Sequence, residues 1–548
     1  MDKFKKSPYL EHIQGEIPGI ISLVDREITS QTYGCGDRTF WCWKFTDFPG
    51  ARFQEYIYTI CWLYSNESFE NNFKDNTLLL EWIEGGIDYW TKIQHKNGSF
   101  DEAYPNEHSL AATAFTLFYI TEAYLLVEKQ LSKQIKNKFK KTALNAADWL
   151  CLNDETHGFL SNHLAAAATA LYNVYDILGD NKYINRSNYF KNRILSHQSD
   201  EGWYEEYGGA DPGYQTHGSF YLARLFKKTQ DSELLESLKN ANKFLSYFIH
   251  PDGSIGGEYS SRNTMFYYPA TFEILYNECE FARVIANKQR KTIAEKKGVG
   301  VWQMDAYNIF PVLNNYIFAF NAANHNLEPS NNTSVLPCET EFEKLLKDCG
   351  IYLKSTKKYY AILGGKKGGV IRIFDKTTNK LAFQSCGYID SRNNEWISNQ
   401  FQGVSTIQIK NGKIIMDAPF VKMNQRTFTP IMFVLFRIYN IFFGRIKVFA
   451  YWLKLLLVKK LINLQKQYGT RLIRQIRCND DSFVFEDSIV GKYSEKLRHV
   501  DKFTTFHMGS SRYADTDEEA IRGRYYHNIT LKMNGNIIER GVINFDES

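Results

Sequence analysis

The chain has 548 residues, too many for one compact core, and this length indicates at least two domains. Apolar residues make up 44% of it and charged residues 23%, which excludes a disordered or fibrous chain. The net charge of +5 is unevenly placed, because residues 421–477 hold twelve Lys and Arg and no Asp or Glu, leaving −7 on the rest. Aromatic residues reach 15%, which suits either aromatic-rich cores or a sugar-binding cleft.

The nine cysteines are scattered, odd in number and without a CxxC or Cys/His cluster at zinc-ligand spacing. Neither a disulfide framework nor a structural zinc site is therefore expected, and no metal or other cofactor is predicted. No apolar run follows the basic residues near the N-terminus, so we expect no secretory signal. Free thiols suit a reducing compartment, and the expected location is the cytoplasm.

After an N-terminal segment over residues 1–49, amphipathic patterns predict a helical domain over 50–340. The clearest helix is His163–Leu178, where apolar residues recur at helical spacing until Gly179-Asp180 stops it. The other predicted helical stretches are 52–66, 77–95, 107–130, 132–152, 183–196, 214–229, 231–250 and 267–290.

Within this region a Gly-aromatic or Gly-apolar turn, a short polar link and a helix recur. The marking glycines are Gly98, Gly158, Gly202 and Gly253, at separations of 60, 44 and 51 residues. A repeat of this length holds two helices and two links, the unit of a helical toroid. Since the links of a closed toroid gather at one end, residues from different repeats are expected to meet in one cleft.

Beyond about residue 355 the pattern changes to period-two alternation bounded by Gly, Asn and Asp, which predicts antiparallel strands. Asn411-Gly412 and Asn534-Gly535 are strong hairpin signals. The predicted fold is an α+β multidomain chain, with an N-terminal α/α toroid followed by an antiparallel β-sandwich over 355–548.

The basic segment 421–477 interrupts that sandwich and is also rich in apolar residues. Its longest uncharged run, Thr427–Phe436, has ten residues, whereas a bilayer core needs about 20, so a spanning helix is not expected. Helices lying on an anionic membrane surface fit both features, and a hairpin packed on the protein's own body is the alternative. Nucleic acid is not an expected partner, because exposed Phe and Leu have no role on a duplex. The predicted membrane-binding residues are Phe433, Phe436, Arg437, Phe442, Phe443, Arg445, Trp452 and Lys454.

The links of the toroid hold the polar residues that suit chemistry. Ser161 or Asn162 is the predicted N-cap of the 163–178 helix, and His163 follows in its first turn, where the helix dipole favours a neutral imidazole. Tyr214 and His217 are three residues apart and hence on one helix face. The predicted catalytic residues are Tyr214, His163 and His217, and the predicted substrate-binding residues are Asn162, Arg262, Asn263, Trp203 and Glu205.

At these loops the chain resembles the heparinase II/III-like polysaccharide lyases and their relatives in surface-polysaccharide gene clusters. In that family an Asn-His pair at a helix start and a Tyr after an Asp-Pro element surround a uronic acid. Asn162-His163 matches the pair, and Tyr214 follows Asp211-Pro212. The resemblance also implies a histidine from the β-domain, for which His499 and His507 are candidates.

The chemistry expected from such residues is removal of the C5 proton of a uronate. Asn162 and Arg262 would bind the carboxylate and spread the developing charge, while Tyr214 or His163 acts as the base. Expulsion of the C4 oxygen gives a lyase, and return of the proton on the other face gives a C5-epimerase; the sequence does not separate the two.

Two other functions stay open from the sequence. The chain could be a non-catalytic glycan-binding or assembly protein, since a fold does not fix a function. It could also be a glycoside hydrolase that uses paired carboxylates from the same loops. The candidate acids are Asp101, Glu102, Glu205, Glu206, Asp211 and Glu258.

Together these features predict a cytoplasmic protein that is peripheral on the inner face of the membrane. Its expected partners are that anionic surface and an acidic polysaccharide or lipid-linked oligosaccharide of surface-polysaccharide synthesis. Nothing in the sequence indicates an oligomeric state.

Overall fold

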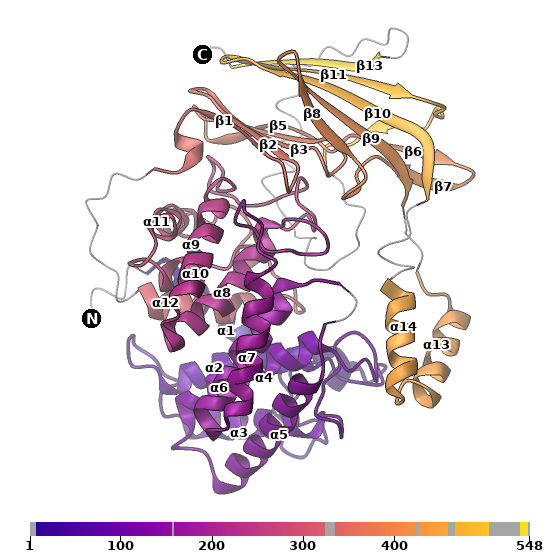
Figure 1. Ribbon diagram of the computed structural model, residues 1–548. Helices are drawn as coiled ribbons and strands as arrows, with labels where there is room; N and C mark the ends of the chain where they lie inside the picture. The colour runs from indigo at the N-terminus through magenta and orange to yellow at the C-terminus, as the bar shows by residue number, and fades with distance from the viewer. Residues whose placement is uncertain are drawn as a thin grey trace.

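The computed structural model describes residues 7–155, 158–323, 335–423, 427–458, 466–502 and 537–545. Over these residues a helical domain lies beneath two stacked sheets, and a helical hairpin lies beside the helical domain (Figure 1). This arrangement confirms the predicted fold class of a helical N-terminal domain followed by antiparallel sheets.

Six helices form a closed inner ring, in which each packs on the next and the last packs on the first. They are α2 (Tyr56–Ser65), α4 (Leu110–Val127), α6 (Ser161–Leu178), α8 (Pro212–Thr229), α10 (Ala270–Ile274) and α12 (Ile309–Ala323). Helix α4 is the one described helix long and apolar enough to cross a bilayer, and 89% of it is buried. A helix that is apolar on all sides needs protein around it, which the ring supplies.

The outer ring consists of helices with one apolar face. They are α3 (Thr77–Lys92), α5 (Lys133–Leu152), α7 (Asn181–Leu195), α9 (Ser232–Ser246), α11 (Glu280–Ala294) and α1 (Pro8–Leu23). Helix α1 packs on α11 and α12. The hydroxyl of Tyr9 donates to Glu273 Oε1 at 2.6 Å, and His12 Nε2 donates to the carbonyl of Ile293 at 2.9 Å. The N-terminal segment that the sequence placed outside the toroid therefore contributes a helix to it.

The stretch 267–290 was wrongly predicted as one helix. It contains the short α10 and the beginning of α11, separated by a turn over residues 275–279. Leu275 and Tyr276 are buried in that turn, so the apolar pattern continues across it. The sequence pattern reported burial correctly but could not show that the chain crosses from the inner to the outer ring.

Three of the four repeat glycines, Gly98, Gly202 and Gly253, lie where the links pass close to an outer helix. Gly98 has φ +96°, and a Cβ there would lie 2.1 Å from the carbonyl oxygen of Asn145. Gly202 has φ +99°, and its Cβ would lie 2.4 Å from the carbonyl oxygen of Asn240. Both positions need glycine for its backbone conformation and for its size. Gly158 has neither constraint, so the repeat is not uniform.

We expect Gly202→Ala to lower the free energy of unfolding by about 2 kcal/mol or more, because it adds a backbone clash to a strained φ. Gly179→Ala is the matched control, since Gly179 has φ +77° and no atom within 4 Å of the added Cβ. The control should lose only about 1 kcal/mol. Urea unfolding followed by circular dichroism measures both, and equal losses would contradict the close approach.

Two antiparallel sheets form the β-domain. The first has strand order β1-β2-β3-β4-β5, and the second has β12-β6-β7-β9-β10-β11-β13 with β8 paired to β9. The first sheet comprises β1 (Phe342–Leu346), β2 (Ile351–Ser355), β3 (Tyr359–Gly364), β4 (Val370–Asp375) and β5 (Lys380–Ser385). The second comprises β6 (Tyr388–Arg392), β7 (Glu395–Ser398), β8 (Thr406–Lys410), β9 (Lys413–Lys422), β10 (Gln467–Cys478), β11 (Ser482–Val490), β12 (Arg498–His499) and β13 (Ile537–Asn544). Phe383 of the first sheet stacks on Phe485 of the second at 5.2 Å between ring centres, so the sheets share a core.

The hairpin signal at Asn411-Gly412 is confirmed. These residues have φ +50° and +70° and join β8 to β9, as a type I′ turn requires. Asn534-Gly535 lies outside the described residues.

The helical insert is narrower than the predicted range 421–477. It consists of α13 (Pro430–Phe442) and α14 (Lys447–Val458), while residues 467–477 belong to strand β10. Arg474 on that strand is fully buried and donates to Asp487 at 2.7 Å, so it belongs to the sandwich core and not to a basic surface. Sequence charge alone could not separate a buried, paired arginine from an exposed one.

The β-domain packs on the links of the toroid. Lys367 Nζ donates to the carbonyl of Ser261 at 2.9 Å, and Arg372 pairs with Glu258 at 3.6 Å. The sheets thereby cover the loop that carries Arg262, which fixes one wall of the cleft described next.

Candidate active site

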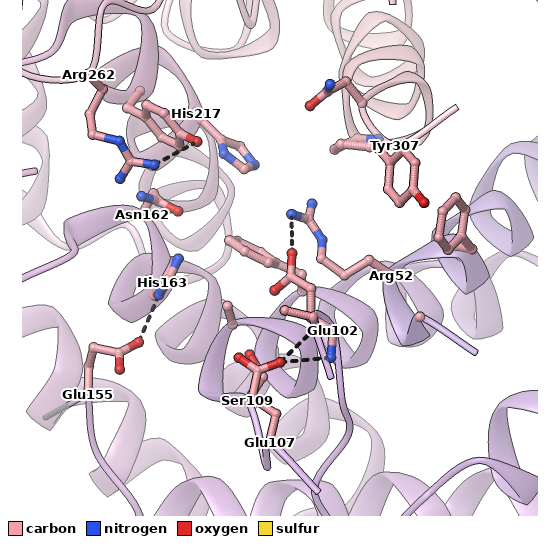
Figure 2. Close-up of a pocket in the computed structure, with 18 of the residues that line it drawn as sticks. Arg52, Glu102, Glu107, Ser109, Glu155, Asn162, His163, His217, Arg262 and Tyr307 are labelled. Carbon is pink, nitrogen blue, oxygen red and sulfur yellow. Dashed lines mark hydrogen bonds and ion pairs between the residues drawn. The ribbon is translucent and has the colours of Figure 1, made fainter. Parts of the chain in front are cut away.

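A cleft of about 460 Å³ opens at the end of the toroid where α4, α6, α8 and α12 begin. Because helix N-termini carry partial positive charge, this end of the ring favours an anionic ligand. Figure 2 shows many of the polar side chains that line it. The lining residues are Gly50, Arg52, Phe53, Glu102, Ala103, Glu107, Ser109, Ala111, Phe115, Glu155, Asn162, His163, Tyr207, Tyr214, His217, Arg262, Phe266, Tyr268, Tyr307, Asn308, Pro311 and Lys454.

Asn162 lies in the first turn of α6 and is bound to the buried carboxyl of Glu206. Its Nδ2 donates to both carboxyl oxygens at 2.9 and 2.8 Å, and its backbone N–H donates at 2.9 Å. Burial raises the pKa of Glu206 to about 7, although Asn162 acts to lower it. Neither Ser161 nor Asn162 caps the helix: the N-cap is Leu160, and Ser161 Oγ donates to the carbonyl of Glu205 at 2.8 Å. The predicted cap was wrong because the Glu206 loop binds these side chains instead.

We expect Glu206 to make stability depend on pH. Its pKa in the folded protein exceeds that of an exposed carboxyl, so its ionisation costs stability as pH rises from about 4.5 to above 7. Glu206→Gln should therefore match the wild type at pH 5 and exceed it by about 1–3 kcal/mol at pH 8. Thermal unfolding of both proteins at the two pH values measures this. A difference that is the same at both pH values would contradict a raised pKa.

His163 is oriented by a carboxylate. Its Nδ1 contacts Glu155 Oε2 at 2.8 Å, and its ring meets Phe115 edge to face. A carboxylate accepts the Nδ1 proton, so Nε2 is the ring nitrogen that would exchange a proton with a substrate.

Tyr214 and Arg262 form a second polar contact in the cleft. Arg262 Nη2 donates to the Tyr214 hydroxyl at 3.4 Å, and the guanidinium lies over the rings of Tyr214 and Tyr207 at 4.5 and 4.2 Å. Asp211 holds both residues, because its carboxylate accepts the backbone N–H of Tyr214 and of Arg262 at 2.9 Å each. Burial raises the pKa of Tyr207 to about 12, so this phenol stays protonated. A guanidinium beside a phenol oxygen stabilises negative charge that develops on it.

His217 is neutral and tightly packed. Burial, with Arg52 and His163 nearby, holds its pKa well below the usual value. Its ring stacks on Tyr268 at 4.2 Å, and Nε2 lies 2.9 Å from the Tyr221 hydroxyl. It therefore supplies an uncharged wall beside Tyr214.

Three predicted substrate-binding residues do not line the cleft. Trp203 is partly buried and donates to Glu201 at 3.2 Å, and Asn263 is buried with φ +58°. Glu205 lies in the same loop as Glu206, but it is Glu206 that binds Asn162. Among the β-domain candidates, His499 on the edge strand β12 contacts Ser385 at 2.7 Å and does not line the cleft, and His507 lies outside the described residues.

The carboxyls proposed for hydrolysis are bound to other groups. Asp211 caps α8, Glu206 binds Asn162, and Glu258 pairs with Arg372. Glu102 does line the cleft, where it forms an ion pair with Arg52 at 3.5 Å. Arg52 also pairs with Glu55 at 2.7 Å.

Asp101 holds the loop that carries Glu102. Its carboxylate accepts the backbone N–H of Asn106 at 2.7 Å and of His108 at 2.9 Å, and it contacts His95 Nε2 at 2.7 Å. Within the described residues, His95, Asp101 and His108 are the group whose ligand atoms lie close enough for a metal ion, within 4.8 Å of one another. Their hydrogen bonds account for the arrangement as a brace for the loop.

The hairpin residues separate into two sets. Phe433, Phe442, Phe443, Arg445 and Trp452 are exposed, with Trp452 at 67%. By contrast, Phe436 meets Tyr104 edge to face at 5.3 Å, Arg437 pairs with Asp47 at 2.9 Å, and Lys454 lines the cleft. Three residues assigned to a membrane from the sequence thus lie against the toroid, because one face of the hairpin docks there.

Sequence reasoning missed Arg52, Glu155 and Glu206 as site residues. Arg52 and Glu155 lie outside the glycine-marked links that were searched. Glu206 was considered only as a hydrolytic acid, and nothing in the sequence indicated its bond to Asn162, 44 residues away.

Comparison with known proteins agrees with this fold. Residues 22–270 match the family described as Ulvan lyase N-terminal domain, a range that holds most of the cleft. The chondroitin AC lyase of Streptomyces coelicolor A3, solved with chondroitin sulphate, is 10% identical with a TM-score of 0.56. The comparison covers 88% of this chain and 66% of that one, so this chain spans slightly less than two thirds of it. The heparan sulfate lyase HepC of Pedobacter heparinus is 9% identical, with a TM-score of 0.42 and coverage of 88% and 68%.

No curated protein sequence matches the chain significantly. The fold matches that of the chondroitin AC lyase, a helical toroid followed by antiparallel sheets. The predicted resemblance to polysaccharide lyases of the heparinase type is thereby confirmed.

Proposed function

We propose that this protein removes the C5 proton of a uronate residue in an acidic poly- or oligosaccharide, as a β-eliminating lyase or a C5-epimerase. The observation that carries the proposal is the contact between the Tyr214 hydroxyl and Arg262 Nη2, in one cleft with Asn162 and His163. The similar proteins are named for acidic polysaccharides, namely ulvan, chondroitin and heparan sulfate, which supports the substrate class.

The carboxylate of the substrate is the first group to be bound. Arg262 is cationic and Asn162 lines the same cleft; because Asn162 Nδ2 donates to both oxygens of Glu206, a substrate carboxylate would have to share this amide with Glu206. Four helix N-termini add partial positive charge. Neutralising the carboxylate lets it accept the electron pair released when the C5–H bond breaks.

A base then takes the C5 proton. Whether the C4–O bond breaks decides between a lyase and an epimerase. Tyr214, once deprotonated, or His163 through Nε2 takes the C5 proton. In a lyase the C4–O bond breaks, a C4–C5 double bond forms, and the leaving oxygen receives a proton from the phenol or imidazole. In an epimerase the C4–O bond stays intact and a group on the other face returns a proton to C5.

We also propose that the exposed face of the α13–α14 hairpin lies on an anionic membrane surface, which suits a lipid-linked substrate at the inner face of the membrane. The hairpin exposes apolar side chains over both helices. Its described charged residues are all cationic, and an exposed one such as Arg445 is worth about 1 kcal/mol near an anionic surface. Tyr439 donates to the carbonyl of Phe449 at 3.0 Å, which ties the two helices together.

The test is incubation of the purified full chain with ulvan, chondroitin, heparan sulfate and polyuronates in heavy water. A lyase produces shortened chains with an ultraviolet-absorbing double bond, and an epimerase incorporates deuterium at C5 without shortening them. New reducing ends with neither signature would replace the proposal by hydrolysis. Retention on immobilised glycan without any reaction would replace it by a binding function.

A further inference from the structure

The hairpin of α13 and α14 forms part of the cleft wall, although it belongs to the β-domain in sequence. Asn106 Nδ2 donates to the carbonyl of Asn440 at 3.2 Å, and Arg437 pairs with Asp47 at 2.9 Å. These contacts, with the Tyr104–Phe436 ring pair, dock the hairpin on the loops beside α4. Figure 1 shows the hairpin beside the toroid and well away from the sheets.

Docking brings one cation, Lys454, into the cleft. Lys454 is partly buried, and its ammonium forms no salt bridge with any residue that the structure describes. The other two cations of the cleft are engaged: Arg52 pairs with Glu55 and Glu102, and Arg262 contacts Tyr214. A half-buried ammonium without an ion pair costs desolvation, which an anionic ligand would offset.

Glu107 is an acid of the same wall whose carboxyl interacts electrostatically with Lys454. Glu107 is positioned by the backbone N–H groups of Glu102 and Ala103, which donate to its Oε2 at 3.1 and 2.8 Å. Burial raises the pKa of Glu107 to about 7, with Lys454 acting to lower it. At neutral pH this carboxyl is only partly ionised, so it does not fully neutralise the Lys454 ammonium.

We propose that Lys454 forms a second anion-binding subsite, which takes a carboxylate, sulfate or phosphate group next to the reacting uronate. The inference rests on the proposed function, because it places a second anion beyond the one bound by Asn162 and Arg262. Glu107 and Arg262 lie on opposite sides of the cleft in Figure 2, so one extended ligand would contact both walls. The cleft volume of about 460 Å³ suits more than one sugar.

Two sources supply such an anion. It is either an acidic group on a neighbouring sugar or the phosphate of a lipid carrier. The second source is suggested by Trp452 on the same helix, which is 67% exposed on the outer face of the hairpin.

The test compares Lys454→Gln with Lys466→Gln in the full chain. Lys466 is an exposed lysine at the end of the same insert, so both variants lose one charge but only one loses a cleft residue. With sulfated chondroitin oligosaccharides, Lys454→Gln should weaken binding by about tenfold or more, or raise KM with kcat nearly unchanged. Lys466→Gln should bind as the wild type does, and Lys454→Arg should restore binding. Circular dichroism and thermal unfolding confirm that each variant is folded.

Further ligands identify the anion. A penalty with unsulfated chondroitin oligosaccharides but not with methyl glucuronoside assigns the neighbouring carboxylate, and a penalty that needs sulfate assigns a sulfate ester. If inorganic pyrophosphate displaces the bound oligosaccharide from the wild type but not from Lys454→Gln, the anion is assigned as a carrier phosphate. Equal binding of Lys454→Gln and Lys466→Gln to all these ligands would overturn the subsite. If the wild type binds no acidic glycan at all, the proposed function fails instead.

Discussion

Replacing Tyr214 with phenylalanine is expected to lower kcat by about 10²- to 10⁴-fold, since one proton-transfer group is lost. The change removes a single oxygen, while the ring keeps its contact with Phe266 at 5.3 Å and its place beneath the Arg262 guanidinium at 4.5 Å. KM should therefore change little. Single-turnover measurements of C5 exchange or chain cleavage would separate this loss from changes in binding.

Tyr307→Phe is the matched control, because this phenol also lines the cleft but contacts Phe53 and not Arg262. It should stay within about tenfold of the wild type. His163→Ala is expected to show a loss comparable to that of Tyr214→Phe, since the Glu155–His163 pair is the other proton-transfer unit of the cleft. Full activity in both Tyr214→Phe and His163→Ala would exclude this cleft as the reaction site.

Deleting the hairpin is expected to weaken binding to anionic vesicles at least about 100-fold without unfolding the β-domain. The vesicle contact of the exposed basic residues, at about 1 kcal/mol each, is lost together with the exposed apolar side chains. The sheet should survive, because β9 and β10 are direct neighbours with Val421 opposite Gln467. Lys422 N–H also donates to the carbonyl of Lys466 at 3.0 Å, so an Asn-Gly turn can replace the residues between them.

Co-sedimentation with vesicles of phosphatidylglycerol and phosphatidylcholine measures this binding. The wild type should bind less well as salt is raised and hardly at all to vesicles of phosphatidylcholine alone. Trp452→Ser with Phe442→Ser is a control that keeps every charge and should lose only part of the affinity. If the protein without the hairpin co-sediments with vesicles as the wild type does, the membrane proposal is wrong.

The helices of the toroid could be predicted from the sequence because the patterns that indicate them are local. The helix spacing of 163–178 and the turn at Gly179 depend on residues within a few positions, and α6 begins only two residues before the predicted start. The turn between α10 and α11 and the place of α1 were missed for the opposite reason. Their positions depend on packing partners far away in the chain, which leave no local pattern.

The site was predictable only in part, for the same physical reason. Asn162, His163, Tyr214 and Arg262 each follow a link signal, and the structure brings all four to one cleft. The partners that orient them, Glu206 and Glu155, carry no signal of their own. Lys454 shows the limit most plainly, since its place in the cleft depends on how a β-domain hairpin docks on the toroid.

The contacts of α1 bear on how the protein is made. This first helix packs on α11 and α12, and its bonds to Glu273 and Ile293 span 264 and 281 residues. During synthesis the helix leaves the ribosome long before those partners exist, while each inner helix meets a neighbour much sooner. At about 5–20 residues per second this interval lasts tens of seconds at the slower rates. Its apolar face must therefore wait unpaired or under a chaperone, and completion of the outer ring is a late event in folding.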